Sequence, residues 1–508
     1  MKRVEHLTIV GGGSAGWLCA AYFARRSNLT KASPQMAWGD KLKVTIIDKE
    51  VPDRIGVGEA TILAFGRFMG EMGFDDDYWQ EKVDAIHKGA IVFEGWTTPE
   101  HEMWHPFGFT DITYNINEAG NYDVAPLWDV WSVYKDKFDL KETQALYTTA
   151  LANRIEPNNM NVYANHLDAG KLAEFLKEES ITHPCLTHIE SDVTEVHWHD
   201  NGEVDYLKLK DGREHRSDLY VDCTGFKRLL SRDPKKDMVD LSDRLFTNTA
   251  IAGPIQYQNR DVEMHPWTHA KTVDCGWIWV TPIISRIGSG LVFNRNITDP
   301  DHAKDVFVDY WDNRIKKEDL RTLNWDPVKA KNGWVGNVVS IGLSAGFIEP
   351  LESTGLALIV RAIETLEENI RGDWYDENEI ALFNARVNGA YENSIDFVNM
   401  HYGFTQRTEP FWQHVRDTYQ KSEIYKFWEA QMKDPDHTTR QTQKFGFFGG
   451  HNFAVCMAQW NPDLCVRKNY FDKYSEQLEK NMQHFYNQLQ ENIDLSVPLK
   501  EKLPWLKE

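Results

Sequence analysis

Short apolar runs recur along the chain, three of them followed by a glycine turn and one by an acid, and this pattern predicts the buried strands of a parallel sheet. Both faces of such strands are covered, so apolar residues follow one another without alternation. The runs lie at residues 7–10, 42–48, 220–223 and 338–341. The first is followed by a glycine-rich turn and then by a helix-like stretch that begins at Trp17. A strand, a glycine turn and a helix start together form the first unit of a nucleotide-binding fold.

The hydrophobic pattern is different between and after these strands. Residues 203–209 alternate between apolar and polar side chains, as antiparallel strands with one exposed face do. Helical periodicity dominates the C-terminal part, including residues 361–370 and 473–493. We therefore predict an α/β protein with a Rossmann-like, doubly wound domain that is discontinuous along residues 1–355 and carries an inserted antiparallel sheet. Residues 356–508 are expected to form a mainly helical region.

The first glycine turn has the spacing of a dinucleotide fingerprint. Its residues are Gly11, Gly13, Ser14, Ala15 and Gly16. The glycines admit the tight turn and let a pyrophosphate approach the N-terminus of the following helix. Asp48 ends the second strand and suits a ribose hydroxyl, although it comes later than the usual ~20 residues after the glycines. The alternative for Asp48 is a surface acid at the end of a strand.

Composition and charge exclude several classes of partner and site. Lysine and arginine total 56 against 77 acidic residues, and the resulting charge of -21 opposes binding to nucleic acid. The six cysteines are scattered without a CxxC pair, which fits a reducing compartment better than a disulfide framework or a zinc site, so no metal is expected. No apolar run approaches the ~18 residues of a membrane span, and no signal peptide is apparent. We expect a cytoplasmic protein without a membrane partner.

Five segments carry a resemblance to a known family. They are residues 11–16, 56–61 (Gly-Val-Gly-Glu-Ala-Thr), 87–91 (His-Lys-Gly-Ala-Ile), 277–282 (Trp-Ile-Trp-Val-Thr-Pro) and 347–355 (Phe-Ile-Glu-Pro-Leu-Glu-Ser-Thr-Gly). In this order they resemble the flavin-dependent halogenases, best represented by the tryptophan halogenases, nearly from end to end. A lone Gly-x-Gly-x-x-Gly is weak evidence, whereas the whole set is specific. One departure is Thr281, where the family's tryptophan motif normally has isoleucine.

The resemblance implies an FAD cofactor, a fold of the flavin monooxygenase type and a helical C-terminal region that completes the substrate pocket. It places the cofactor at Gly11, Gly13, Ser14, Ala15, Gly16, Asp48, Ala60, Gly225, Gly342, Leu343 and Leu356. No nicotinamide site is evident in the sequence. Reduced flavin (FADH2) is therefore expected to arrive by diffusion from a separate flavin reductase. A monomer or a homodimer is expected.

The turn at residues 353–355 offers a halide site. Halide binding needs backbone N–H donors and a small polar side chain in a tight turn, which Ser353, Thr354 and Gly355 supply. The family resemblance places the ion at Thr354 and Gly355. The alternative is an ordinary helix N-terminus with Ser353 or Thr354 as its cap, and both roles are compatible because a cap region is itself an anion site. The sequence does not choose between chloride and bromide.

Two further residues suit the chemistry that such an enzyme performs. Reduced flavin and oxygen supply an electrophilic oxygen, which a halide ion converts to hypohalous acid. A lysine can guide this oxidant, either as an ammonium that hydrogen-bonds it or as an amine that carries the halogen, and Lys88 interrupts an apolar stretch at the family's catalytic position. Glu352 suits the base that removes the ring proton and stabilises the cationic intermediate. The alternatives are a surface lysine and a turn carboxylate that caps neighbouring amides.

An aromatic substrate would be held between aromatic side chains. Residues 104–108 (Trp-His-Pro-Phe-Gly) match the family segment that provides two such walls, His105 and Phe107. The third wall in tryptophan halogenases is a tryptophan late in the chain, and Phe448 is the best match for it here. The alternative for all three is plain core packing.

The tryptophan-specific enzymes also carry two tyrosines and a glutamate that grip the amino and carboxylate groups of the substrate. The corresponding places fall near Asp436, His437 and Gln443, none of which is the expected residue. We therefore expect an electron-rich arene such as indole rather than free tryptophan.

The sequence thus predicts an FADH2-dependent halogenase, an oxidoreductase that uses O2 and bromide or chloride. A flavin-dependent aromatic monooxygenase (hydroxylase) is the alternative, and it would need neither Lys88 nor a halide turn. A non-catalytic flavin-binding module would be favoured only if Lys88 or Glu352 were absent, and both are present.

Overall fold

The computed structural model describes residues 1–29, 42–49, 58–107, 111–116, 122–139, 154–155, 163–370, 374–436, 446–495 and 497–503. The chain divides into two compact units, each made of three segments. The first unit comprises Met1–Ala85, Leu167–Leu245 and Asn324–Glu392, and the second comprises Ile86–His166, Phe246–Leu323 and Asn393–Glu508. The boundary at residue 355 between a flavin-binding and a helical domain stays a prediction.

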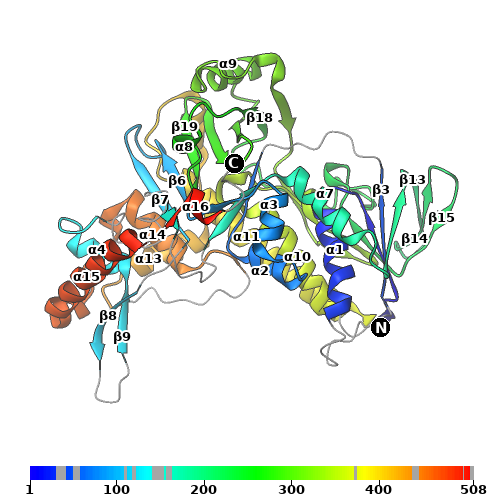
Figure 1. The fold of residues 1–508 in the computed structure, drawn as a ribbon, viewed down its shortest axis with the longest axis horizontal. Helices are drawn as coiled ribbons and strands as arrows, with labels where there is room; N and C mark the ends of the chain where they lie inside the picture. The colour runs from blue at the N-terminus through cyan, green and yellow to red at the C-terminus, as the bar shows by residue number, and fades with distance from the viewer. Residues whose placement is uncertain are drawn as a thin grey trace. The chain divides into compact units, whose positions relative to one another are not determined.

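The first unit is built on a six-stranded, mostly parallel sheet (Figure 1). The strand order is β12 (Leu186–Glu190), β3 (Lys43–Asp48), β2 (His6–Val10), β16 (Leu219–Asp222), β25 (Val338–Ser340) and β24 (Trp334–Val335). All pairs are parallel except β24 with β25. The predicted apolar runs therefore form adjacent buried strands, as the doubly wound fold requires.

Both faces of this sheet are covered. On one face, helix α1 (Ser14–Leu29) contacts β2 and β3 and packs against α7 (Ala169–Ser180) and α10 (Thr354–Ile370). The other face carries an antiparallel meander of β13 (Val193–Trp198), β14 (Val204–Leu209) and β15 (Glu214–His215). Figure 1 shows the meander and α1 on opposite sides of β3. Buried side chains such as Val10, Ile47 and Leu207 form the core between sheet and meander.

The remaining elements of the first unit are short. They are β1 (Lys2–Arg3), β4 (Glu59–Ala60), α2 (Ala64–Glu71), α3 (Asp76–Lys82), η3 (Gly225–Lys227), β17 (Met238–Asp240), β23 (Val328–Ala330), η5 (Gly342–Ser344), η6 (Pro350–Glu352) and β26 (Trp374–Tyr375). The long helix α11 (Glu377–Tyr402) has residues in both units.

The second unit is built on a seven-stranded sheet, which confirms the predicted insertion. The strand order is β22 (Arg321–Asn324), β18 (Thr249–Ile255), β21 (Ile287–Phe293), β20 (Gly276–Pro282), β19 (Trp267–Val273), β6 (Ala90–Glu94) and β7 (Glu102–Pro106). The pairs from β18 to β19 and the pair β6–β7 are antiparallel, while β19 and β6 are parallel. Helix α9 (Pro300–Tyr310) contacts β18 and β21 and closes an apolar core over them.

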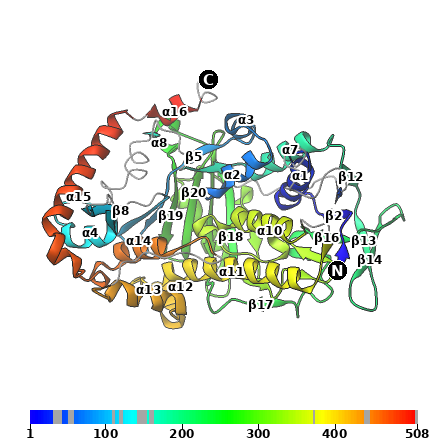
Figure 2. The ribbon, with the colours of Figure 1, turned by 90° about the horizontal axis from the view of Figure 1, so that it is seen from below.

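Helices make up much of the rest of the second unit, as predicted for the C-terminal part. They are α4 (Leu127–Tyr134), α8 (Arg260–Glu263), α12 (Pro410–Thr418), α13 (Glu423–Lys433), α14 (Gly450–Trp460), α15 (Tyr470–Leu495) and α16 (Leu499–Lys502). Figure 2 shows α4 beside α14 and α15, which it contacts. The 3-10 turns η4 (Lys317–Asp319) and η7 (Pro462–Leu464) and the short strands β5 (Ile86–Lys88), β8 (Asp111–Ile116), β9 (Tyr122–Pro126), β10 (Arg154–Ile155), β11 (Ala164–Leu167) and β27 (Val497–Pro498) complete it.

None of the helices in the described part of the chain has both the length and the apolar character that crossing a bilayer requires.

Candidate functional site

The glycine turn of the first unit is packed as tightly as its sequence predicts. Gly11 has a φ of +113°, and a Cβ on it would lie 2.3 Å from the carbonyl oxygen of Cys223. A Cβ on Gly16 would lie 1.8 Å from the carbonyl oxygen of Gly11. A Cβ on Gly13, in contrast, would meet nothing within 4 Å. The turn is therefore closed against the sheet and open at Gly13, where a phosphate group would have room to approach.

Asp48 lies directly beside this turn. Its side chain is buried, and a Cβ on Gly12 would lie 1.9 Å from its Oδ2. Oδ1 lies 2.5 Å from His188 Nε2 on β12, whereas the buried Oδ2 has no hydrogen-bond partner among the described residues. A free carboxylate oxygen next to the glycine turn suits a ribose hydroxyl, and it contradicts the alternative of a surface acid. His188 was not singled out by the sequence, because its signal is only a position on a neighbouring strand.

The two later glycine turns of the first unit are stabilised by different contacts. Gly225 has a φ of +70°, and its turn is held by Asp222, which accepts hydrogen bonds from Thr224 N at 2.9 Å and Thr224 Oγ1 at 2.6 Å. Burial raises the pKa of Asp222 above its usual range, while these hydrogen bonds oppose the rise. Gly342 has a φ of +76°, and a Cβ on it would lie 2.8 Å from the Cβ of Ala15. The third turn therefore packs directly against the start of α1.

Three other residues predicted to contact the cofactor also lie in the first unit. Ala60 in β4 is partly buried, Leu343 in η5 is exposed, and Leu356 in α10 is buried. An exposed leucine beside a glycine turn provides an apolar surface that a flat ring system could cover.

The turn that precedes α10 holds its residues in a fixed conformation. Glu352 ends η6 and is buried, and Ser353 follows in the left-handed region with a φ of +59°. Thr354 begins α10 with 0% exposure, and its Oγ1 is buried without a hydrogen-bond partner among the described residues. A Cβ on Gly355 would meet nothing within 4 Å. A helix N-terminus, a free hydroxyl and open space at the next residue together suit a small anion.

Lys88 lies in the second unit, at the end of β5. Its side chain is 0% exposed, and Nζ lies 4.7 Å from the centre of the Phe107 ring. His166 on the paired strand β11 is also buried; burial, and then the charge of Lys88, lower the pKa of His166 well below 6.5. His166 is therefore neutral, with its ring nitrogens bonded to Pro282 O at 3.0 Å and Thr268 Oγ1 at 2.8 Å. The reading of Lys88 as a surface lysine is wrong.

The predicted aromatic walls come together around a residue that the sequence did not reveal. The ring centres of His105 and Phe107 are 6.4 Å apart, and those of His105 and Phe448 are 6.3 Å apart. Phe397 of α11 stacks on Phe448 at 4.0 Å and lies 5.3 Å from His105. Phe397 lies in α11 among many buried residues. Its sequence context therefore does not distinguish it from a residue that only packs in the core.

Two asparagines fix the positions of these rings, and neither was predicted. Asn393 Oδ1 accepts from the backbone N–H groups of Phe447 (2.9 Å) and Phe448 (2.8 Å), and its Nδ2 donates to Phe448 O at 2.8 Å. Asn452 Oδ1 accepts from Gly449 N at 2.9 Å and caps α14, while its Nδ2 lies 3.0 Å from His105 Nε2. Because Asn452 Nδ2 is the donor, His105 Nε2 is the acceptor of this hydrogen bond.

Comparison with known proteins identifies the family of the chain. Residues 6–462 match the protein family described as tryptophan halogenase. The chain belongs to the tryptophan halogenase family. Its membership makes the protein a flavin-dependent halogenase, an oxidoreductase, with a Rossmann-like FAD-binding fold, and the hydroxylase and binding-module alternatives are set aside.

Several relatives of this halogenase are similar over most of their length. Tryptophan 6-halogenase ThaL of Streptomyces albogriseolus is 29% identical over 429 residues, which are 81% of this chain and 79% of that protein. Tryptophan 7-halogenase RebH of Lentzea aerocolonigenes is 29% identical over 437 residues, 81% of this chain and 78% of that protein. A flavin-dependent halogenase structure from Xanthomonas campestris has a TM-score of 0.86 at 25% identity, covering 99% and 98% of the two chains. BrvH, a flavin-dependent halogenase from Brevundimonas sp., has a TM-score of 0.83 at 26% identity and covers both chains fully.

The family's tryptophan motif forms β20 of the halogenase. Trp277 is fully buried and donates from Nε1 to Tyr402 OH at 3.0 Å, and Thr281 is buried too. Asp436 is exposed, and its Oδ1 accepts from Asn469 Nδ2 at 2.5 Å. His437 and Gln443 lie outside the described residues, as do residues 56–57 of the second motif.

Proposed function

We propose that this halogenase combines reduced flavin, dioxygen and a halide ion to halogenate an electron-rich arene of the indole type. The observation that carries the proposal is the fully buried ammonium of Lys88, which faces Phe107 in a cluster of aromatic side chains. Lysine side chains are almost never fully buried, so a lysine with 0% exposure is a candidate for a functional role.

The residues of the first unit fit an FAD molecule. The open side of Gly13 and the N-terminus of α1 would receive the pyrophosphate, and the free Oδ2 of Asp48 would accept from a ribose hydroxyl. The exposed Leu343 and the turn at Gly225 would line the ring system. Bound as FADH2, the cofactor supplies, with O2, the oxidising power that turns halide into hypohalous acid.

Thr354 and its neighbours would hold the halide ion. The unsatisfied Oγ1 of Thr354 can donate to an anion, and the first N–H groups of α10 have no partners within the helix. The left-handed Ser353 directs the chain into this turn. Donors of this kind accept both chloride and bromide, so we expect activity with each ion.

Lys88 would direct the oxidant to the arene. Its ammonium can hydrogen-bond hypohalous acid and make the halogen more electrophilic, or its amine can carry the halogen. Because His166 is neutral, no positive charge on its ring repels the ammonium of Lys88. Glu352 would accept the ring proton that substitution releases and would stabilise the preceding cationic ring.

The aromatic walls favour a flat, uncharged substrate. The ring centres of Phe107, Phe448 and Phe397 each lie within 6.4 Å of that of His105 and provide ring faces and edges. The positions that bind the zwitterionic end of tryptophan in the tryptophan-specific enzymes lack the expected residues, and the carboxylate of Asp436 would oppose that of the substrate. We therefore infer that indole or a similar arene is preferred, with substitution at its most nucleophilic carbon, C3.

The partners follow from the same chemistry. We propose that a separate flavin reductase delivers FADH2 by diffusion, and that the enzyme acts in the cytoplasm as a monomer or homodimer.

The test is a product screen by mass spectrometry. Purified enzyme, a flavin reductase, FAD and a nicotinamide cofactor are incubated with indoles and phenols, in chloride or in bromide. The proposal requires halogen isotope patterns in the products; products that gain oxygen alone would contradict it.

A competition assay tests the substrate class. Equal concentrations of indole and tryptophan should yield mainly 3-haloindole. Preferred halogenation of tryptophan at one benzo-ring carbon would show that a clamp exists and would overturn the substrate assignment, while leaving the halogenase chemistry intact.

A further inference from the structure

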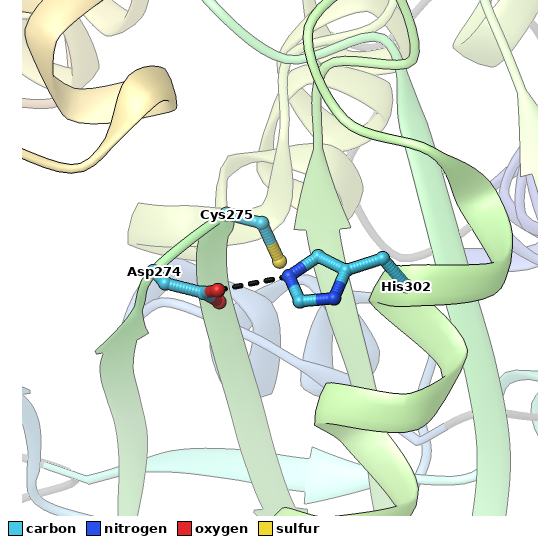
Figure 3. A group of neighbouring side chains, drawn as sticks. All are labelled: Asp274, Cys275 and His302. Carbon is cyan, nitrogen blue, oxygen red and sulfur yellow. Dashed lines mark hydrogen bonds and ion pairs between the residues drawn. The ribbon is translucent and has the colours of Figure 1, made fainter.

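A hairpin turn and a helix of the second unit bring three metal-binding side chain types together (Figure 3). Strands β19 and β20 are joined by the two-residue turn Asp274-Cys275, since Val273 pairs with Gly276. A Cβ on Gly276 would lie 2.0 Å from the carbonyl oxygen of Val292, so glycine is needed where the turn enters β20. His302 comes from the first turn of α9, which begins at Pro300.

The three side chains point toward one another. A carboxylate oxygen of Asp274, Sγ of Cys275 and a ring nitrogen of His302 all lie within 4.8 Å of one another. Asp274 Oδ2 lies 2.8 Å from His302 Nε2, and Asp274 Oδ1 is a buried atom without a hydrogen-bond partner among the described residues. In the described part of the chain this is the one group of three such ligands.

From this geometry we propose that Asp274, Cys275 and His302 bind a zinc ion. Zinc takes oxygen, thiolate and imidazole ligands at about 2.0–2.3 Å, which places tetrahedral ligand atoms about 3.3–3.8 Å apart. No ligand pair here has CxxC spacing, which is why the sequence predicts no metal.

The charges of the site suit a divalent cation. A carboxylate and a thiolate together neutralise two positive charges, and neutral imidazole is the third ligand. Burial, with the charge of Asp274, raises the pKa of the Cys275 thiol, so zinc binding releases the thiol proton to solvent.

The site leaves the fourth zinc position open to water. Cys275 is 4% exposed, whereas the side chains of Asp274 and His302 are 45% and 52% exposed. The hairpin of β19 and β20 continues into the tryptophan motif, and α9 covers the sheet. The ion would connect the tip of this hairpin to α9. Its role is structural and does not depend on the proposed substrate or halide.

Cobalt(II) titration of the chelator-treated, reduced full-length enzyme tests the site, because cobalt replaces zinc and absorbs light. We expect one cobalt per chain, a thiolate-to-cobalt absorption band in the near ultraviolet, and displacement of cobalt by zinc. Cys275→Ser should abolish that band. His302→Ala, a change at an exposed side chain, should weaken binding by about tenfold or more.

Cys185→Ser is the matched control. Cys185 also has a histidine partner, with Sγ 3.2 Å from His183 Nδ1, but among the described residues it belongs to no three-ligand group. This variant should retain the full cobalt spectrum. A wild-type enzyme without the thiolate band, or a band that survives in Cys275→Ser, would overturn the proposal. Zinc should also raise the melting temperature of the wild type, and at the same zinc concentration it should raise that of either site variant less.

Discussion

The candidate sites of the two units of the halogenase consist of different kinds of chemical group. In the first unit the site is made of backbone: glycines with φ of +113°, +70° and +76°, a left-handed serine and the starts of two helices. In the second unit it is made of side chains: a buried lysine and a cluster of aromatic rings held by two asparagines. Backbone donors suit phosphate and halide ions, whereas ring faces suit a flat arene. In the proposed function, the first unit holds the cofactor and the anion, and the second unit selects the substrate.

This difference predicts different responses to mutation. Changing one side chain in the first unit leaves most backbone donors in place, so effects should be confined to one ligand. Changing a side chain in the second unit removes the binding surface itself. The following predictions test this contrast, from the largest expected effect to the smallest.

Lys88→Met should lower halogenation by about a thousandfold or more, because Lys88 is the residue proposed to activate the oxidant. FAD binding and hydrogen peroxide release should remain, since they depend on the first unit. The matched control is Lys468→Met, which removes another buried lysine of the second unit, whose Nζ donates to Met432 O and Asp434 O. That variant should lose stability but retain activity per folded molecule. Halogenation by Lys88→Met would remove the lysine from the mechanism.

Glu352→Gln should slow turnover by about a hundredfold, the usual scale for losing a general base. The amide keeps the shape of the side chain, so the melting temperature should change little. Glu349→Gln, three residues earlier and also buried, is the control and should have a much smaller effect on rate. Equal rates for both variants, measured by product formation under saturating substrate, would make Glu352 a structural residue.

Thr354→Val should raise the KM for halide by about tenfold, the scale of one hydrogen bond to a charged group. Valine has the same shape but cannot donate, and the backbone donors of α10 remain. Thr365→Val serves as the control, because its Oγ1 donates to Arg361 O at 2.6 Å within the same helix. FAD affinity should be unchanged in both variants. An unchanged halide KM in Thr354→Val would place the ion elsewhere.

Asn452→Asp should raise the KM for the arene about threefold to tenfold with little effect on the flavin, because the carboxylate cannot donate to His105 Nε2. It still accepts from Gly449 N, so the cap of α14 and the melting temperature should be preserved. Asn452→Leu loses both bonds and should reduce stability as well. If the KM for the arene rises only in Asn452→Leu, the variant that loses stability, and not in Asn452→Asp, then Asn452 acts only as a cap.

Two titratable groups, one in each unit, should lose their contributions to stability in different pH ranges. Burial, and then the neighbouring His6, lower the pKa of His215 in the first unit from 6.5 to about 4, so its contribution is present above pH 6.5 and is lost as pH falls toward 4. The hydrogen bond from His269, opposed by burial and supported by Lys271, lowers the pKa of Glu94 in the second unit from 4.5 to about 2. Its contribution is lost only below pH 4.5.

Urea unfolding at several pH values checks this prediction. His215→Gln should flatten the loss of stability between pH 6.5 and 4, and Glu94→Gln should flatten the loss between pH 4.5 and 2. Parallel curves for wild type and variant would show that the residue does not titrate as described.

The first unit could be predicted well from the sequence because its features are local. Glycine spacing, an apolar run and a terminal acid are adjacent in the chain, and Asp48 indeed lies beside the turn. The second unit depends on residues that are distant in sequence. Phe397, Asn393 and Asn452 belong to no recognisable motif. The sequence pattern of a residue that packs in a helix or caps one is the same whether or not a substrate binds nearby.

The interleaved order of the segments has a consequence for how the chain acquires its structure during synthesis. Because each unit comprises three segments, the chain passes from one unit to the other five times. β2 leaves the ribosome first, but its sheet is not complete until β25 has been made at residues 338–340. The second sheet waits for β22 at residues 321–324. Neither unit is available as a contiguous fragment, so the nascent chain must keep its apolar strands from aggregating until well over half of the sequence has emerged.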